Sequence, residues 1–214
     1  MNADEIARYL RTHPQFFDQH PELLTTINVP HPYGGRAIPL AERQTVALRE
    51  KLKMLEGRLS ELLQFGEEND AISEKVHRLS VALVGARDFP ALASSLYFHL
   101  REDFAVPHVA LRVWGKSVPA DFDEAQPVDE GQRLHAGTMG APQCGPALGN
   151  PYLGWFGEQA QHLRSMALVP LGQTAVFGLL ALGSEDPKRF YSEMGTLYLR
   201  RIGELCAAGV TARL

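Results

Sequence analysis

Histidine and cysteine are among the residues that most often act as a nucleophile, a general base or a metal ligand. Their spacing in this chain favours none of these uses. His13 and His20 each precede a proline, which suits a loop or the start of a helix. His108 and His135 could meet across a sheet, where a packed or hydrogen-bonded histidine is more common than a metal ligand. The two cysteines do not form a Cys-x-x-Cys pair. We therefore predict no metal site.

The motifs of the common enzyme classes are also absent from the sequence. It has no Gly-x-Ser-x-Gly elbow, no His-Glu-x-x-His motif and no Gly-x-Gly-x-x-Gly loop. The glycine pair at residues 34–35 does not belong to a phosphate-binding loop. We predict no catalytic residues, so the question becomes what the chain binds and which elements position the binding residues.

Leucines at alternating spacings of four and three residues form the strongest pattern in the chain. The pattern contains one slip, and it consists of Leu48, Leu52, Leu55, Leu59, Leu62, Phe65, Asn69, Ile72, Val76, Leu79 and Leu83. Such a narrow apolar stripe is typical of a helix that pairs with another helix of similar length. We therefore expect a coiled-coil helix over residues 40–84 and a homodimer through residues 48–83. Polar Asn69 at a seam position would fix the register.

Short amphipathic segments precede this helix. Asp4 could cap a helix that ends before Pro14, because the residue ahead of a proline disfavours helical dihedrals. The phrases at residues 13–17 and 20–24 each place a proline before an apolar pair, as at the start of a short helix. The stretch 29–39 is rich in proline and glycine and is interpreted as a linker. Residues 1–39 are thus predicted to form short helices and a Pro/Gly-rich arm.

Residues 85–214 are predicted to form one α+β domain. Asp88 would cap a helix that ends before Pro107, and residues 109–113 have the alternating pattern of a strand. A last helix near the C-terminus would bury an apolar stripe that includes Ile202.

The middle and the end of this domain supply the rest of the sheet. Residues 133–139 could form a weak strand, and residues 140–157 are expected to form loops over an interior. Two apolar strands, at 165–171 and 175–183, would pair as a hairpin. The order of elements predicts an antiparallel sheet with helices on one face.

A ligand site, if the domain has one, should lie between the sheet and the loops over it, since small-molecule pockets are concave and mostly apolar. By position, the lining residues would be Arg112, Trp114, Cys144, Tyr152, Phe156 and Ser165. Arg112 could contact an anionic group. Each residue also has an ordinary structural alternative, such as core packing for Trp114 and Phe156 or solvent exposure for Arg112.

The phrase from Ser165 to Glu185, followed by Phe190 and the closing helix, resembles the C-terminal half of GAF domains. Over nearly its whole length, the chain is similar to a bacterial family called domain-of-unknown-function family 484. The matching residues are His13-Pro14-x-Phe16-Phe17, His20-Pro21-Glu22-Leu23-Leu24, Pro30-His31, Leu40-x-Glu42-Arg43-Gln44, Leu48-Arg49 and Glu68-Asn69. The resemblance implies a GAF-like fold behind an N-terminal helical region, with no activity established for the family.

GAF domains bind small molecules or serve as dimerisation modules, and they often signal through helices at their ends, so the resemblance implies a regulatory role. Two specialised ligands are disfavoured. The Asn-Lys-x-x-x-Phe-x-x-x-Asp-Glu text of the cyclic-nucleotide subset is not evident, and Gly145 follows Cys144 where bilin-binding relatives have histidine. The identity of any cofactor stays open.

Bulk composition narrows the classes of partner. A formal net charge of −4 gives no reason to expect nucleic acid or an anionic membrane. Residues 1–10 lack the apolar core of a signal peptide, and the longest apolar stretch, near 175–183, is too short to span a bilayer. With two cysteines and no paired motif, a reducing compartment fits best. We expect a cytoplasmic protein.

Two functions remain open. As a sensor, the domain would bind a small cytoplasmic ligand and change the register or splay of the paired helices, which a partner protein would read through the N-terminal helices. Gly66 and the slip in the leucine pattern would make the coil locally weak. As a scaffold, the domain would fill its pocket with its own side chains, and the paired helices would hold the N-terminal helices for docking.

Overall fold

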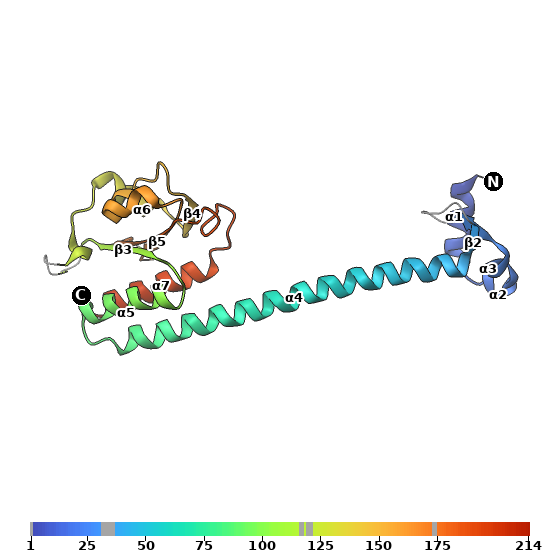
Figure 1. Cartoon of the computed structure of the whole chain (residues 1–214), viewed down its shortest axis with the longest axis horizontal. Coiled ribbons are helices and arrows are strands. Elements are labelled where there is room, and N and C mark those ends of the chain that lie inside the picture. Colours follow the sequence, from blue (N-terminus) through green and yellow to red (C-terminus); the bar gives the residue numbers. More distant parts are fainter. Residues whose placement is uncertain (1, 31–36, 116–117, 119–121, 173–174) are drawn as a thin grey trace. The chain divides into compact units, whose positions relative to one another are not determined.

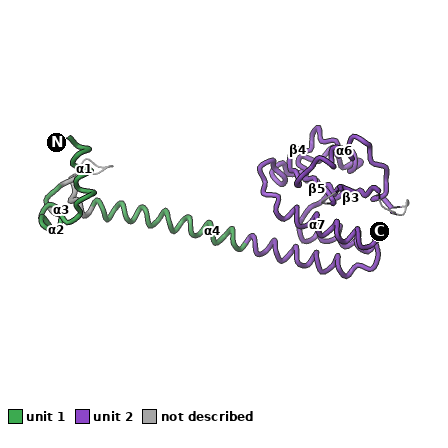
Figure 2. The backbone as a smooth tube through the Cα atoms, turned by 180° about the vertical axis from the view of Figure 1, so that it is seen from behind, with its two compact units in different colours: residues 1–67 green, residues 68–214 purple. Residues whose placement is uncertain are grey.

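The computed structural model describes residues 2–30, 37–115, 118, 122–172 and 175–214, without the side chains of residues 24, 25, 28–30 and 37–42. The chain forms two compact units, Met1–Glu67 and Glu68–Leu214, called here the N-terminal unit and the globular unit. Their boundary falls inside one continuous helix, α4 (Leu40–Gly85), as the two colours of the tube in Figure 2 show. The long helix predicted for residues 40–84 is therefore present.

The N-terminal unit begins with three helices and a small hairpin. They are α1 (Ala3–Thr12), α2 (Phe16–Gln19), α3 (Glu22–Thr26), β1 (Asn28–Pro30) and β2 (Ala37–Pro39). The cap of α1 is Asn2, not Asp4 as predicted. Asn2 Oδ1 accepts from the Glu5 N–H at 2.8 Å, and Glu5 Oε2 accepts from the Asn2 N–H at 2.9 Å. This reciprocal capping box satisfies two backbone donors at once, which a cap at Asp4 would not do.

Residues 29–39 were predicted to form a linker, but the two parts of this segment that the structure describes are strands. β1 and β2 pair antiparallel, with Val29 opposite Ile38, and residues 31–36 lie outside the described residues. The prolines Pro30 and Pro39 stand at the ends of these strands. Proline is tolerated there because a two-stranded ribbon needs few donors from its outer edges.

The globular unit is an antiparallel four-stranded sheet with helices, which confirms the predicted α+β class. Its elements after α4 are α5 (Phe89–Glu102), β3 (His108–Val113), the 3₁₀ helix η1 (Asp123–Ala125), α6 (Glu130–Thr138), β4 (Gln143–Pro146), the 3₁₀ helix η2 (Leu153–His162), β5 (Ser165–Leu171), β6 (Gly178–Ser184) and α7 (Leu197–Thr211). The strand order is β3-β6-β5-β4. The predicted hairpin is β5 with β6, in which Leu168 lies opposite Ala181.

Helices cover both faces of the sheet, although the sequence predicted them on one. Side chains alternate between faces along each strand, and the two sets belong to separate apolar clusters. Leu111, Val169 and Leu180 pack with α4, α5 and α7, on what we call the helical face. Met166 and Leu179 pack under α6 and the segment around η2, on what we call the aromatic face. Figure 1 shows α5 and α7 on one side of β3 and β5, and α6 on the other.

Two further predictions fail around α6. The segment 133–139, expected as a weak strand, forms the end of α6 and its C-cap Met139. The helix starts at Asp129, whose Oδ1 accepts from the Gly131 N–H at 2.8 Å. Residues 140–157, expected as loops, contain the edge strand β4, in which Cys144 lies opposite Ala167. A four-residue strand with Gly145 and Pro146 carries too little alternating pattern to be recognised in the sequence.

The last part of α4 belongs to the core of the globular unit. Val76, Leu79 and Leu83 are at most 9% exposed and pack on the helical face, so this part of the expected seam is occupied by the chain itself. Asp88 caps α5 as predicted, with its Oδ1 accepting from the Ala91 N–H at 2.9 Å. The globular unit therefore begins at Glu68, earlier than residue 85.

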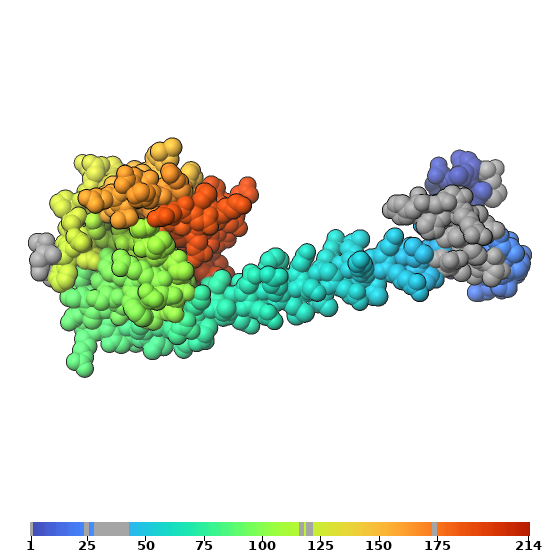
Figure 3. All heavy atoms as spheres, in the orientation of Figure 1, coloured from blue at the N-terminus to red at the C-terminus, as the bar shows by residue number. Residues whose placement is uncertain are grey.

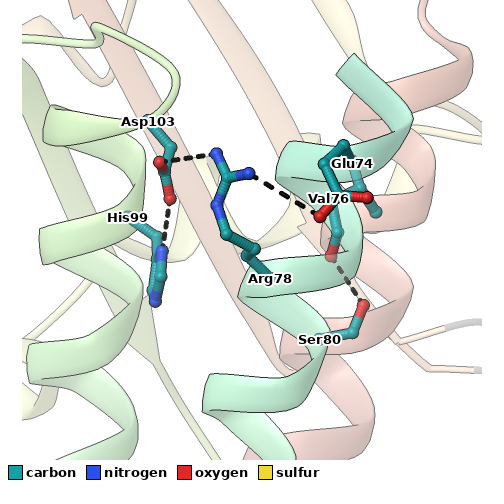
Figure 4. Close-up of polar contacts among 6 residues, drawn as sticks. All are labelled: Glu74, Val76, Arg78, Ser80, His99 and Asp103. Carbon is teal, nitrogen blue, oxygen red and sulfur yellow. Dashed lines mark hydrogen bonds and ion pairs between the residues drawn. The ribbon is translucent and has the colours of Figure 1, made fainter. Parts of the chain in front are cut away.

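Polar contacts add to this packing between α4 and α5 (Figure 4). Arg78 Nη2 lies 2.8 Å from Asp103 Oδ1, and His99 Nδ1 lies 2.5 Å from Asp103 Oδ2. The Arg78 guanidinium points from α4 toward α5, and its Nη1 also lies 3.8 Å from Glu74. Hydrogen bonds from Arg78 and then His99 lower the pKa of Asp103, so the carboxylate stays ionised.

Candidate functional site

Four of the six predicted lining residues do come together, on the aromatic face. Trp114, Tyr152 and Phe156 pack on its apolar cluster, and Arg112 joins them through the ring of Trp155. The remaining two, Cys144 and Ser165, lie elsewhere, because both belong to the set of strand residues that faces α4, α5 and α7.

Tyr152 is the centre of the aromatic face. Its ring is fully buried, stacks on His135 and meets the edge of Trp155 at a centroid distance of 5.0 Å. Its hydroxyl donates to the Gln132 carbonyl oxygen at 2.8 Å and lies 3.0 Å from His135 Nδ1. Burial raises the pKa of Tyr152, against a smaller lowering from the backbone hydrogen bond of Ala136. These contacts fix the ring as a core residue that anchors α6.

Arg112 is a buried cation, with a side chain held by neutral groups. Only 8% of the residue is exposed. Nη1 donates to the Leu111 carbonyl oxygen at 3.0 Å, Nη2 donates to Gln126 Oε1 at 3.1 Å, and the guanidinium lies 5.6 Å from the centroid of the Trp155 ring. No carboxylate of the described residues lies within 4.0 Å of it. The alternative of a solvated strand residue is thus wrong, and a contact with an anionic ligand stays a prediction.

A second buried polar pair lies near Arg112. Tyr97 on α5 donates its hydroxyl proton to Glu124 Oε1 at 2.5 Å, and Glu124 is only 4% exposed. Burial and then Glu124 raise the pKa of Tyr97, while Arg112 lowers it slightly. Sequence reasoning missed both residues, because Glu124 stands in an acidic stretch that looks solvated.

Cys144 and Ser165 have structural surroundings. Burial raises the pKa of the half-buried Cys144 thiol, which disfavours a reactive thiolate. Ser165 Oγ donates to the Asp186 carbonyl oxygen at 2.7 Å and accepts from the Phe190 N–H at 3.3 Å. This serine therefore ties the start of β5 to the segment that follows β6.

A groove of the globular unit lies apart from these six residues. It has a volume of about 1040 Å³ and is lined by Gly137, Thr138, Met139, Gly140, Ala141, Pro142, Val169, Pro170, Gly172, Ala175, Val176, Phe177, Arg200, Gly203, Glu204, Ala207, Ala208 and Thr211. None of the six predicted residues is part of this lining. Small residues on α7 make the space, and Gly203 sits so close to β5 that a Cβ atom there would be 2.5 Å from Val169 Cγ1. The small residues of α7 that line the groove are Gly203, Ala207, Ala208 and Thr211. Their recurrence on one side of the helix is a signal in the sequence that we missed.

A second candidate binding surface is a row of exposed leucines on α4, in the N-terminal unit. We call it the leucine row, and it consists of Leu48, Leu52, Leu55, Leu59 and Leu62. Each of these side chains is between 52% and 67% exposed. In the space-filling view, side chains of α4 in this stretch stand open on the face shown (Figure 3). Exposed leucines in one row on a helix are typical of a surface that another helix covers.

Two other kinds of site were searched for. The described residues contain no group of three or more His, Cys, Asp or Glu side chains that could hold a metal ion. In the described ranges, no helix combines the length and the apolar character needed to cross a bilayer.

Comparison with known proteins gives relatives along nearly the whole chain. The uncharacterised protein YigA of Escherichia coli strain K12 and that of Salmonella typhimurium strain LT2 are each 24% identical over 204 residues, which is 92% of this chain and 86% of the relative.

Two solved GAF domains are also similar. One, assigned to a sensor histidine kinase from Pseudomonas syringae pv. tomato, has 18% identity and a TM-score of 0.47 over 70% of this chain and 91% of that domain. The other is the A. aeolicus nlh2 GAF domain in an inactive state, with 16% identity and a TM-score of 0.44 over 68% of this chain and 99% of that domain.

The family model that matches is described as a protein of unknown function, DUF484, and the match extends from residue 1 to residue 211. This agrees with the resemblance carried by the His-Pro phrases and the start of α4. The chain therefore belongs to the DUF484 family.

Proposed function

We propose that this chain is a non-catalytic, GAF-like regulatory protein that works as a cytoplasmic homodimer and transmits the state of its globular unit through α4. A small molecule would be the signal, and a separate protein that contacts the N-terminal helices would receive it. The observation that carries the proposal is the double use of α4. Its first half exposes the leucine row, while its last turns are built into the core of the globular unit.

The leucine row supports the dimer. A side chain such as leucine gains about 1.5–3 kcal/mol when it is fully buried, and five of them at one helix surface stay more than half exposed in the single chain. A second copy of the same helix would bury all five in a short coiled coil. Because Val76, Leu79 and Leu83 are already covered, the proposed interface is residues 48–62 and not the whole range 48–83.

Contacts at two points of α4 support transmission. Arg78 binds Asp103, which caps the end of α5, and Arg213, just beyond α7, donates to the backbone oxygens of Leu83 and Ala86 at 2.9 Å and 2.6 Å. These carbonyls belong to the last turn of α4 and to the residues after it, where they have no partner within the helix. A shift of α5 or α7 would therefore move α4 with it.

Two observations bear on whether a ligand is involved. The groove beside α7 supports a sensor, since its volume is close to the upper end of the range of small-molecule pockets and α7 is one of its walls. The filled aromatic face supports the second candidate, a ligand-free dimerisation and protein-interaction scaffold, because Tyr152 and its neighbours occupy the space where we expected the ligand.

Sedimentation of a double variant tests the dimer. Replacing Leu55 and Leu59 with aspartate should give monomers, because two buried charges would face their copies across the seam. Lys53→Asp with Ser60→Asp is the matched control, since both residues are exposed and lie away from the leucine row. A double Leu→Asp variant with the wild-type mass would remove the proposal.

Mass spectrometry of the denatured protein separates the two candidates. A stoichiometric small molecule released from the purified protein would support the sensor. Repeated blanks, together with no thermal shift across a metabolite library, would leave the scaffold as the function.

A further inference from the structure

The leucine row has a definite heptad frame. A step of three residues connects position a to position d, and a step of four connects d to the next a. Leu48, Leu55 and Leu62 are therefore d residues, while Leu52 and Leu59 are a residues.

This frame ends at the globular unit. Its next positions are Gly66, Asn69 and Ser73, and the Tyr198 hydroxyl of α7 lies 3.1 Å from Ser73 Oγ and donates to the Asn69 carbonyl oxygen at 3.0 Å. The slip between Leu62 and Phe65 starts a second frame, whose later residues face the chain's own core. The orientation is therefore derived from residues 48–62, and a role of Asn69 in fixing the register stays a prediction.

Charged residues flank the leucine row at the positions that decide orientation. Arg49 and Glu56 occupy e positions, and Lys51 and Arg58 occupy g positions. All four are exposed, and in the part of the chain that the structure describes, no ion pair within 4.0 Å involves any of them. Such e and g charges select the partner and its direction in coiled coils.

A parallel pair matches these charges. In a parallel, in-register coiled coil, each g residue faces the e residue five positions later in the second copy. Lys51 then faces Glu56 of the second copy, and the two-fold axis repeats this attraction. The other g residue, Arg58, faces the uncharged Leu63 of the second copy, so no like charges meet.

In antiparallel pairs the flanking charges of the two copies attract each other less well. In this arrangement g residues face g residues, and e residues face e residues. Two such alignments overlap four leucines. With Leu52 opposite Leu55, Lys51 faces Arg58 while Arg49 faces Glu56, so repulsion and attraction cancel.

In the other alignment, Leu52 lies opposite Leu62. Arg58 then faces Arg58 of the second copy, and Glu56 faces Glu56, so both flanking contacts repel. No antiparallel alignment with this overlap has a net attraction.

We propose that the surface on α4 takes a second copy of this chain in a parallel, in-register pair, with Lys51 of each copy bound to Glu56 of the other. The inference rests on the dimer of the proposed function. It gives that dimer one direction, in which both globular units lie at the same end of the coiled coil.

Charge reversal tests the direction. In the parallel pair, Lys51→Glu brings two glutamates together on each side and should raise the dimer dissociation constant about five- to tenfold. Glu56→Lys should have a similar effect, and the double variant Lys51→Glu with Glu56→Lys should restore the wild-type value. Lys53→Glu is the matched control, since it makes the same charge change at an outer position and should leave the constant unchanged. Sedimentation equilibrium at low salt measures all four.

An antiparallel pair predicts a different effect of Lys51→Glu on the dimer dissociation constant. In the first antiparallel pair, Lys51→Glu would face Arg58 and tighten the dimer, and in the second it would face Phe65 and change little. Either result, or a double variant that is weaker than both single ones, would overturn the parallel arrangement. A wild-type protein that sediments as a monomer would instead contradict the dimer itself, so the two failures are distinguishable.

Disulfide crosslinking gives an independent readout. With Cys144→Ser as the background and Cys206 fully buried, Leu48→Cys should crosslink to itself on oxidation in the parallel pair. In the antiparallel pairs, Leu48 faces Leu59 or Gly66, so this variant alone would stay uncrosslinked. Ser60→Cys, on the outer side, is the control.

Discussion

The Tyr198 hydroxyl on α7 donates to the backbone oxygen of Asn69 on α4 at 3.0 Å, two residues after the boundary between the two compact units. It also lies 3.4 Å from Asn69 Oδ1 and 3.1 Å from Ser73 Oγ. The guanidinium of Arg201 lies 5.5 Å from the centroid of the Tyr198 ring. One side chain of α7 thus holds the point where α4 enters the globular unit.

Removing this hydroxyl should loosen α4 locally. Tyr198→Phe keeps the ring but loses the hydrogen bonds, which typically contribute about 0.5–1.5 kcal/mol each. Amide hydrogen exchange of residues 66–74 should become about fivefold faster, with little change in β5 and β6. The control is Tyr191→Phe, which removes the hydroxyl of a tyrosine that is 53% exposed. Equal exchange in the two variants would show that Tyr198 does not hold α4.

Because the last part of α4 belongs to the core of the globular unit, a substitution there should strongly lower stability. Leu79 is fully buried, so Leu79→Ala should lower the free energy of unfolding of the globular unit by about 2–5 kcal/mol. Leu134→Ala removes the same atoms from a side chain that is 66% exposed and should cost less than about 1 kcal/mol. Urea unfolding followed by tryptophan fluorescence compares them. Similar losses would mean that α4 is not part of the core.

Two glycine substitutions should change stability in opposite directions. At Gly203 a Cβ atom would stand 2.5 Å from Val169 Cγ1, so Gly203→Ala should destabilise the globular unit by about 1–3 kcal/mol through overpacking. At Gly57, inside α4, nothing lies within 4 Å, so Gly57→Ala should stabilise the helix by about 1 kcal/mol. Thermal unfolding by circular dichroism measures both. A stable Gly203→Ala variant would show that α7 can move away from β5.

The lowered pKa of Asp103 predicts a stability difference that depends on pH. A carboxyl with a lower pKa in the folded state contributes stability above its unfolded pKa, near 3.9, and loses it as the pH falls through the folded value. The stability difference between wild type and Asp103→Asn should therefore be constant near neutral pH and shrink below about pH 4. In an Arg78→Gln background the difference should be smaller at every pH, because the main partner is gone. A difference that grows in acid would contradict this assignment.

Strong local patterns in the sequence were enough to predict most of the fold. The long helix, the cap at Asp88 and the hairpin of β5 and β6 each rest on a pattern within a few residues, and each is present. The His-Pro phrases also identified the family. Two failures were local, since the caps at Asn2 and Asp129 were overlooked. The strand β4 and the helix on the second face of the sheet depended on neighbours far along the chain.

The candidate site shows the same limit. Arg112, Trp114, Tyr152 and Phe156 are neighbours as predicted, but nothing in their spacing revealed that they fill the space they were expected to line. Cys144 was misplaced because β4 was not recognised, and a strand puts successive side chains on opposite faces.

The leucine pattern itself could not tell which of its residues face another chain. Val76 and Leu79 fit the spacing of the leucine pattern just as Leu55 and Leu59 do. In the structure, however, Val76 and Leu79 pack in the core with α5 and α7, while Leu55 and Leu59 are exposed. Only the exposure of the side chains separates an intramolecular seam from one that needs a partner.

The sedimentation mass of the wild-type protein decides whether two copies pair through α4. At micromolar concentration we expect twice the 23.7 kDa of the chain, and a return to the mass of the single chain when Leu55 and Leu59 become aspartate. A wild-type species of 23.7 kDa that does not change with concentration would contradict it.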